Sequence, residues 1–141
     1  MRIQLVNPLK LEVCVALKAL QDATFAPQEH VDPTEGGWWW LVRDEGAPVA
    51  FAALLPAPSW KDSGYMARCG VLKAARGQGL QRKLLKKRED HAKAMGMKRV
   101  FTTTYNNPAS ANNLIARGYR TYIPAGKWGA QDTIYWRKDL E

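Results

Sequence analysis

The fold is decided by one stretch, Cys69-Gly70-Val71-Leu72-Lys73-Ala74-Ala75-Arg76-Gly77-Gln78-Gly79-Leu80-Gln81. We expect it to begin as an apolar strand over residues 63–72, to pass through a basic turn with two glycines, and to enter an amphipathic helix that ends near Met95. Glycine lets the backbone approach a ligand closely, and a helix N-terminus presents N–H donors at the positive end of its dipole. The stretch therefore predicts a cradle for a phosphate-bearing ligand.

Two other phosphate-binding motifs do not fit these residues. No Gly-Lys-Ser or Gly-Lys-Thr follows the glycines, so the turn is not a P-loop. A dinucleotide fingerprint needs a third glycine and an early βαβ unit, and this chain has neither. A Gly-x-Gly between a strand and a helix is common by itself, so the rest of the chain has to decide its meaning.

A second motif follows about thirty residues later. Residues 99–104 form a run rich in β-branched side chains, which is typical of a strand. Asn107 and Pro108 then carry the signature of a helix start, and Gly118 carries that of its end. Tyr119 follows Gly118 directly. The order is strand, glycine turn, helix, strand, Asn-capped helix and Gly-aromatic.

Taken together, the two motifs resemble those of the GCN5-related N-acetyltransferases. The cofactor signature of that family, Arg/Gln-x-x-Gly-x-Gly/Ala, matches residues 76–81, with Gln81 in place of the last small residue. Val71 corresponds to the strand valine whose main chain would pair with pantetheine. The family's later motif, an Asn followed by Gly-Phe, matches Asn107 through Gly118 and Tyr119.

The resemblance implies the fold and the cofactor. It implies a single N-acetyltransferase domain over residues 1–141, of the α/β class (an α+β mixed sheet), with a central mixed sheet of six to seven strands flanked by about four helices. It also implies acetyl-CoA as cofactor and direct attack of a primary amine on its thioester. The implied cofactor-binding residues are Cys69, Gly70, Val71, Arg76, Gly77, Gln78, Gly79, Leu80, Gln81 and Asn107.

The catalytic residues are less directly indicated. The family's usual proton donor corresponds to Leu114, and leucine cannot donate a proton. Tyr105, at the end of the strand expected over 99–104, is our candidate in its place. In this family the region that corresponds to residues 25–37 covers the acceptor. Its acidic residues Glu29, Asp32 and Glu35, here called the acidic lip, are therefore candidates for attracting an amine, although the same residues also suit an ordinary loop surface.

Composition narrows the class of protein without naming one partner. Lys and Arg number 21 against 13 Asp and Glu, and the surplus of +8 suits a polyanion such as coenzyme A or a nucleic acid. The basic residues follow no recognised nucleic-acid motif, so we do not expect nucleic acid as the partner. The alternatives that stay open are a coenzyme A-binding protein with little or no activity and a small basic nucleic-acid-binding protein.

The same reasoning sets expectations for location and acceptor. Cys14 and Cys69 lack metal-ligand spacing and are too few for a disulfide framework, so we expect no metal and a reduced, cytoplasmic setting. No apolar run is long enough for a membrane span, and the first residues do not form a signal peptide. The acceptor could be a protein N-terminus, a lysine, a small amine or an antibiotic, and the chain could be a monomer or a homodimer.

The remaining elements follow from periodicity and turn residues. We expect a strand over 1–7, a helix over 8–23 with Asn7 as its cap, a hairpin of strands 38–43 and 48–55, and final strands over 119–123 and 132–138. A proline-bearing loop is expected over 56–62. On the helix after the glycine turn, the residues expected to face the core are Leu80, Leu84, Leu85, Ala92 and Met95.

Overall fold

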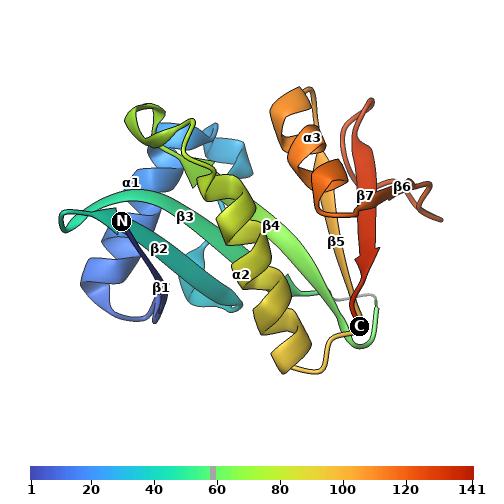
Figure 1. The fold of residues 1–141 in the computed structure, drawn as a ribbon, viewed down its shortest axis with the longest axis horizontal. Coiled ribbons are helices and arrows are strands. Elements are labelled where there is room, and N and C mark those ends of the chain that lie inside the picture. Colours follow the sequence, from blue (N-terminus) through green and yellow to red (C-terminus); the bar gives the residue numbers. More distant parts are fainter. Residues whose placement is uncertain (58–59) are drawn as a thin grey trace. The chain divides into compact units, whose positions relative to one another are not determined.

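The computed structural model describes residues 1–57 and 60–141, so Pro58 and Ser59 of the expected 56–62 loop lie outside the described residues. Within these residues the strands are hydrogen-bonded in the order β1-β2-β3-β4-β5-β7-β6, which confirms a mixed sheet of seven strands (Figure 1). The elements are β1 (Arg2–Val6), α1 (Leu11–Thr24), the 3-10 helices η1 (Pro27–Glu29) and η2 (Pro33–Glu35), β2 (Trp38–Asp44), β3 (Ala47–Pro56), β4 (Ser63–Val71), the 3-10 helix η3 (Lys73–Ala75), α2 (Leu80–Ala94), β5 (Arg99–Thr104), α3 (Pro108–Ala116), β6 (Arg120–Tyr122) and β7 (Ile134–Asp139).

The Cα framework divides into two compact units. Unit 1 comprises Met1–Leu55 and Ala67–Leu85, and unit 2 comprises Pro56–Met66 and Lys86–Glu141. Strand β4 and helix α2 each contribute to both units, because the boundaries at residues 66 and 85 fall inside them. None of the described helices has the length and apolar character needed to cross a membrane.

Unit 1 is built on an antiparallel meander of β1, β2 and β3. The predicted hairpin turn is confirmed, because Asp44 pairs with Ala47 across Glu45 (φ +50°) and Gly46 (φ +85°), as a tight hairpin requires. The aromatic run of β2 supplies its core: Trp39 and Trp40 are buried, and Trp38 is half-buried. Helix α1 packs on this sheet through its buried stripe of Val13, Leu17, Leu20 and Gln21.

Helix α1 begins later than the sequence suggests. The prediction placed its cap at Asn7 and its first turn at Pro8, but the helix starts at Leu11. The side chain of Asn7 instead accepts a 3.0 Å hydrogen bond from the Leu9 amide, and the backbone carbonyl of Asn7 accepts one from the Lys10 amide. Asn commonly closes such a turn with its own side chain. Residues 7–10 therefore form a turn and not the first turn of the helix.

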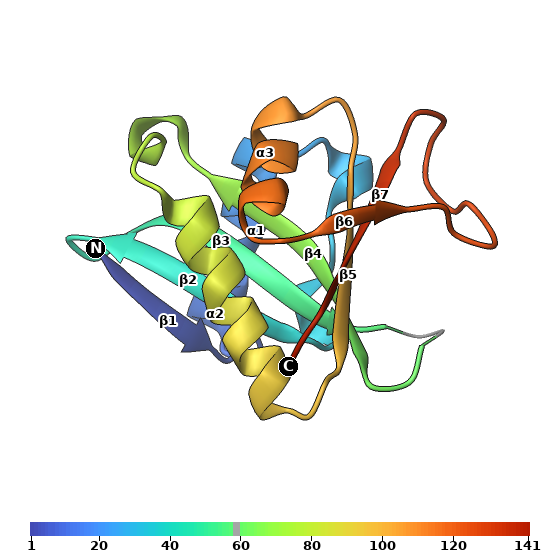
Figure 2. The ribbon, with the colours of Figure 1, turned by 45° about the vertical axis from the view of Figure 1, so that its right-hand side comes forward.

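Unit 2 is built on β5, β7 and β6, the strands coloured orange to red in Figure 2. The start of β4 pairs in parallel with β5, with the register Ser63↔Arg99, Gly64↔Val100 and Tyr65↔Phe101. On its other side β5 pairs antiparallel with β7, and β7 pairs antiparallel with β6. The last strand of the chain therefore lies between two strands that precede it.

Helix α2 confirms most of its predicted pattern but buries two charged residues. Leu80, Leu84, Leu85 and Ala92 are buried as expected, whereas Met95 lies beyond the last helical turn and is 53% exposed. Gly96, with φ +81° in the left-handed region, follows the last turn of the helix. Arg88 and Glu89 are 3% and 2% exposed, although charged residues are seldom buried unless they are paired.

Candidate active site

The end of β4 and the start of α2 form one continuous feature of unit 1, the glycine turn of residues 72–80. Strand β4 ends at Val71, and the short helix η3 separates it from the glycines. The Val71 carbonyl accepts a 3.1 Å hydrogen bond from Arg76 Nε. The next amide, that of Leu72, donates at 2.9 Å to the Val49 carbonyl of β3. The peptide between Val71 and Leu72 is thus held at both its oxygen and its nitrogen.

The two glycines of the turn adopt a conformation that side chains disfavour. Gly77 and Gly79 have φ values of +79° and +74°, in the left-handed region. A Cβ built on either glycine would meet nothing within 4 Å, so backbone conformation and not crowding requires glycine there. Open space therefore lies in front of α2, whose hydrogen-bond ladder begins with the Lys83 amide on the Gly79 carbonyl.

Other predicted cofactor residues have packing roles that the structure makes visible. Gly70 is buried, and a Cβ there would clash with Thr24 at the end of α1 and with Phe51 of β3. Leu80 is 4% exposed, so its side chain belongs to the core and only its main chain can face a ligand. Cys69 and Gln81 are half-buried, and Gln78 is exposed. The structure places residues 69–71 and 76–81 together in unit 1.

The acidic lip lies in a loop whose backbone is well anchored within unit 1. The Gln21 side chain exchanges two 2.8 Å hydrogen bonds with the backbone of Val31. Arg68 of β4 donates from Nε to the Glu29 carbonyl at 2.7 Å. These contacts come from α1 and β4, so two elements of unit 1 hold the loop that carries the lip.

The three lip carboxylates differ in their surroundings. Asp32 caps η2 by accepting hydrogen bonds from the Thr34 amide at 2.9 Å and the Thr34 hydroxyl at 2.7 Å. These hydrogen bonds lower the pKa of Asp32 below its usual value. Glu29 and Glu35 are exposed. Asp32 therefore has a structural role in addition to the electrostatic role predicted for the lip.

The second motif has the predicted local structure within unit 2. Asn107 caps α3 by accepting a 3.1 Å hydrogen bond from the Ser110 amide, Pro108 is the first helical residue, and Gly118 (φ +86°) follows the end. Leu114 is 4% exposed and packs in the core. Tyr105, just past the end of β5, is 60% exposed. The candidate donor Tyr105 is thus accessible, whereas position 114 is not.

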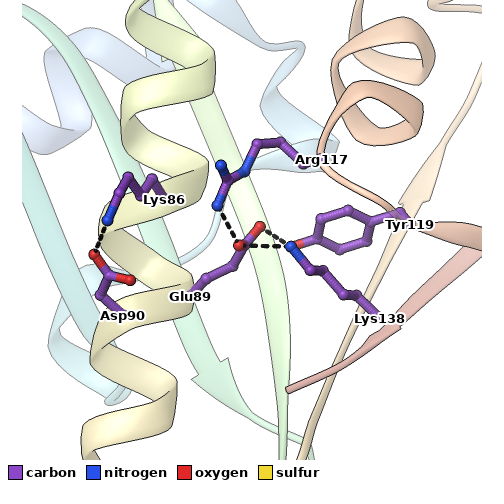
Figure 3. A network of polar contacts seen from close by, with 6 residues as sticks. All are labelled: Lys86, Glu89, Asp90, Arg117, Tyr119 and Lys138. Carbon is purple, nitrogen blue, oxygen red and sulfur yellow. Dashed lines mark hydrogen bonds and ion pairs between the residues drawn. The ribbon is translucent and has the colours of Figure 1, made fainter. Parts of the chain in front are cut away.

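The sequence did not predict a buried charge cluster in unit 2 that centres on Glu89 (Figure 3). Glu89 Oε1 accepts hydrogen bonds from Arg117 Nη2 at 2.7 Å and Lys138 Nζ at 2.9 Å, and Oε2 accepts one from the Tyr119 hydroxyl at 3.0 Å. Burial would raise the pKa of Glu89, but the hydrogen bonds from Arg117, Lys138 and Tyr119 lower it overall. The cluster joins α2 to the end of α3 and to β7.

Tyr119 explains how this cluster relates to the second motif. Its ring is buried, as expected for the residue in the position of the family's Phe, and its hydroxyl reaches Glu89. Burial and the nearby Glu89 carboxylate raise the pKa of Tyr119. A signal for Glu89 was present in the sequence, because residue 89 lies four after Leu85, on the apolar stripe of α2. The described residues contain no group of three or more His, Cys, Asp or Glu side chains that could hold a metal ion.

The fold matches solved structures, and the sequence matches a family model. The structure resembles the "IAA acetyltransferase" of Bacillus cereus ATCC 14579 (15% identity, 99% of each chain covered, TM-score 0.79) and a Bacillus subtilis acetyltransferase in complex with CoA (17%, 99% of each chain, 0.76). It also resembles a Salmonella typhimurium structure with its cofactor acetyl-CoA (18%, 100% of this chain and 94% of that chain, 0.74). These identities establish the fold alone. No curated protein matches the chain. A model of the acetyltransferase (GNAT) family matches residues 10–119, and the chain therefore belongs to that family.

Proposed function

We propose that residues 1–141 form a single N-acetyltransferase domain that transfers the acetyl group of acetyl-CoA to a primary amine. The observation that carries this proposal is the glycine turn, where a fully bonded peptide at Val71 precedes two left-handed glycines and the start of a helix. Membership of the GNAT family supports it, as does the presence of CoA or acetyl-CoA in two structures of the same fold. The low number of cysteines, Cys14 and Cys69 alone, supports a cytoplasmic setting.

The residues of the glycine turn suit the phosphates of coenzyme A. The space at Gly77 and Gly79 is open, and the first-turn N–H groups of a helix have no acceptor within the helix. Arg76 adds positive charge, and Gln78 and Gln81 add amide donors beside the same turn. In this proposal residues 76–81 hold the pyrophosphate, and the main chain of residues 69–71 holds the pantetheine arm. Asn107 is proposed as a further contact from the second motif.

When bound, acetyl-CoA supplies a thioester whose carbonyl carbon accepts the amine. The proposed role of the Val71 main chain is to donate its N–H toward the carbonyl oxygen, where negative charge develops during attack. Because its neighbouring peptide is held at both ends, that donor would need little reorganisation. Holding two reactants in position supplies a large part of the rate in reactions of this kind.

The proposed acceptor contacts are those of the acidic lip. An amine is cationic at neutral pH, so Glu29, Asp32 and Glu35 would raise its local concentration by Coulomb attraction. The amine must lose a proton before or during attack, because only the neutral form is nucleophilic. Since the loop is anchored by Gln21 and Arg68, the lip would act as a preformed surface.

Protonation of the leaving thiolate is assigned to Tyr105 in this proposal. Tyr105 is 60% exposed, and it follows directly on the end of β5. A thiol has a reference pKa of about 8.5, so its thiolate can leave with modest help. A dedicated acid would therefore accelerate the reaction without being indispensable to it.

A second candidate function is coenzyme A binding without catalysis. The observation that favours it is the buried Leu114, which stands where the family usually has its proton donor and is only 4% exposed. Under this alternative the glycine turn would keep its ligand, and no amine would be acetylated.

One experiment separates the candidates. Calorimetry of the full chain with acetyl-CoA, followed by thiol release on a panel of amines, should show binding and turnover of at least one amine. Binding without turnover on any amine would favour the inactive alternative. Tight binding of a DNA duplex or single strand, with no binding of acetyl-CoA, would favour a nucleic-acid-binding protein.

A further inference from the structure

The sheet of unit 2 has two faces with different chemistry. Successive side chains of a strand point to opposite faces, so Trp136 and Lys138 of β7 share one face while Tyr135 and Arg137 share the other. Lys138 reaches Glu89 of α2, so its face is the one that carries the helix. The opposite face carries an aromatic layer: Phe101 and Tyr122 have ring centroids 5.6 Å apart, and those of Tyr122 and Tyr135 are 6.2 Å apart.

Two tryptophans from different loops of unit 2 cover this layer. Trp60 stacks on Phe101, with centroids 4.3 Å apart and planes at 22°. Trp128 meets Tyr135 edge to face, with centroids 4.6 Å apart and planes at 72°. The two indoles also touch each other at 6.0 Å and 61°. Residues from the segment before β4, from β5 and from the β6–β7 loop thus form one ring cluster.

The two indoles remain accessible although they belong to a packed cluster. Trp60 is 39% exposed and Trp128 is 51% exposed. Exposed aromatic surface on a packed cluster commonly marks a binding site. The aromatic patch is defined here as Trp60 and Trp128.

The positive charge of Arg137 on this face indicates which kind of ligand could bind there. Arg137 is exposed, and its guanidinium carbon lies 5.7 Å from the centroid of the Tyr122 ring. The Tyr122 hydroxyl oxygen is buried and has no hydrogen-bond partner in the described structure. A ligand with a ring and an anionic group would match the indoles and the guanidinium, whereas a purely cationic amine would be repelled by Arg137.

We propose that the aromatic patch binds a small molecule that bears both an aromatic ring and a carboxylate. The ring would pack on Trp60 and Trp128, which contact each other and the layer beneath them. The carboxylate would face Arg137, whose guanidinium lies over the Tyr122 ring of the same layer. All of these residues belong to unit 2.

The test measures ligand binding to the full chain in the absence of acetyl-CoA. Calorimetry or ligand-detected NMR would use L-phenylalanine, with two matched comparators: L-cyclohexylalanine, which lacks the π system, and 2-phenylethylamine, which lacks the carboxylate. We expect L-phenylalanine to bind more tightly than either. Trp128→Ala should weaken its binding about tenfold, whereas Trp128→Phe should keep it within about threefold, as expected for an aromatic contact. Arg137→Gln should weaken the binding of L-phenylalanine and should not weaken that of 2-phenylethylamine, whose positive charge Arg137 repels.

Controls separate a failed fold and a failed function from a failed inference. Ile115→Ala removes an exposed apolar side chain of α3 outside the patch and should change neither ligand. Thermal unfolding of Trp128→Ala shows whether the variant folds, and Trp128→Phe tests the contact if it does not. Equal affinity for L-phenylalanine in Trp128→Ala and the parent would overturn the inference. So would binding of a dT12 oligonucleotide, but not of L-phenylalanine, to the patch. If the parent chain binds L-phenylalanine but does not bind acetyl-CoA, only the proposed function is overturned.

Discussion

Arg76 Nε donates a 3.1 Å hydrogen bond to the carbonyl oxygen of Val71, the residue five positions earlier at the end of β4. The guanidinium is therefore folded back over the start of the glycine turn. The hydrogen bond uses Nε, so this contact does not occupy the two terminal nitrogens. Terminal guanidinium nitrogens bind phosphate oxygens in pairs, and Arg76 could do so without losing its contact with Val71.

The first prediction tests the charge tolerated at the glycine turn. Gly79→Glu should reduce acetyl-CoA affinity more than the neutral Gly79→Gln, which has the same size and the same backbone strain at φ +74°. The difference isolates repulsion between the carboxylate and the phosphates, so it should shrink as salt is raised. Calorimetry of both variants at low and high ionic strength checks this. Equal losses in the two variants at every salt concentration would show that only the backbone matters.

The second prediction concerns the packing of Gly70 in β4, the strand proposed to hold the pantetheine arm. Gly70→Ala should destabilise the fold by about 1–3 kcal/mol, because the new methyl group would clash with Thr24 and Phe51 in a well-packed core. Gly126→Ala is the matched control, since a Cβ there meets nothing within 4 Å and its φ is not in the left-handed region. Urea unfolding of both variants gives the comparison. An unchanged unfolding midpoint for Gly70→Ala would mean that α1 and β4 adjust without strain.

The third prediction concerns the acidic lip. The triple variant Glu29→Gln, Asp32→Asn and Glu35→Gln should raise the acceptor KM, with a larger effect at low ionic strength, and should leave acetyl-CoA affinity unchanged. Asparagine is chosen at position 32 because it keeps an oxygen that can cap η2, as Asp32 does for Thr34. Steady-state kinetics at two salt concentrations provide the measurement. If the acceptor KM does not move at low salt, the three residues are an ordinary loop surface.

The fourth prediction concerns the buried Glu89 cluster. Glu89→Gln should cost about 3–5 kcal/mol of stability at pH 7, because Arg117 and Lys138 would keep their charges without a buried partner. Asp90→Asn is the matched control one residue along α2: its pair with Lys86 is exposed, so its loss should cost less than about 1 kcal/mol. Urea unfolding at pH 7 compares the two. Similar midpoints for the two variants would contradict a stabilising role for the cluster.

The same cluster predicts a dependence on acid. The pKa of folded Glu89 is lowered from the ordinary value of 4.5 that we take for the unfolded chain. Its contribution to stability is therefore present above pH 4.5 and is lost as the pH falls through the lower folded pKa. Unfolding titrations between pH 7 and pH 3 should show a steeper loss of stability in the parent than in Glu89→Gln. Parallel curves would assign the acid sensitivity to other carboxylates.

The fifth prediction concerns proton transfer. Tyr105→Phe should lower kcat by about a hundredfold, the usual effect of removing one acid–base group, and should leave acetyl-CoA affinity unchanged. Pre-steady-state mixing with the best amine of the panel, across a range of pH, would show whether the chemical step slows. A variant that turns over like the parent at every pH would assign the proton to water or to the acceptor and leave Tyr105 with a structural role.

Much of the fold could be predicted because local signals and burial agree. The β-branched and aromatic runs of β2 and β5, the Asn107-Pro108 start of α3 and the glycine stop at Gly118 all stand in the structure where the sequence places them. Each is set by backbone chemistry within a few residues. The prediction for the start of α1 was wrong for a related reason. Asn7 and Pro8 suit both a helix start and a turn, and the local sequence does not distinguish the two.

For the candidate site, only the local backbone conformation could be predicted from the sequence. The turn around Gly77 and Gly79 follows from its own residues, so its conformation could be inferred. The partners of Glu89 are 28 and 49 residues away in the chain, and the aromatic patch joins segments more than sixty residues apart. No local pattern encodes such contacts, because they depend on the register between β5, β7 and β6.

The position of β7 between β5 and β6 has a consequence for synthesis of the chain. A ribosome releases β5 and β6 before the segment that pairs with both of them, so one edge of β5 stays open until residues 134–139 emerge. Open strand edges invite pairing with other chains, and nascent domains complete their folding only when the last partner is available. While β5 has emerged and residues 134–139 have not, that edge of β5 can pair with other chains, and the addition of β7 closes it.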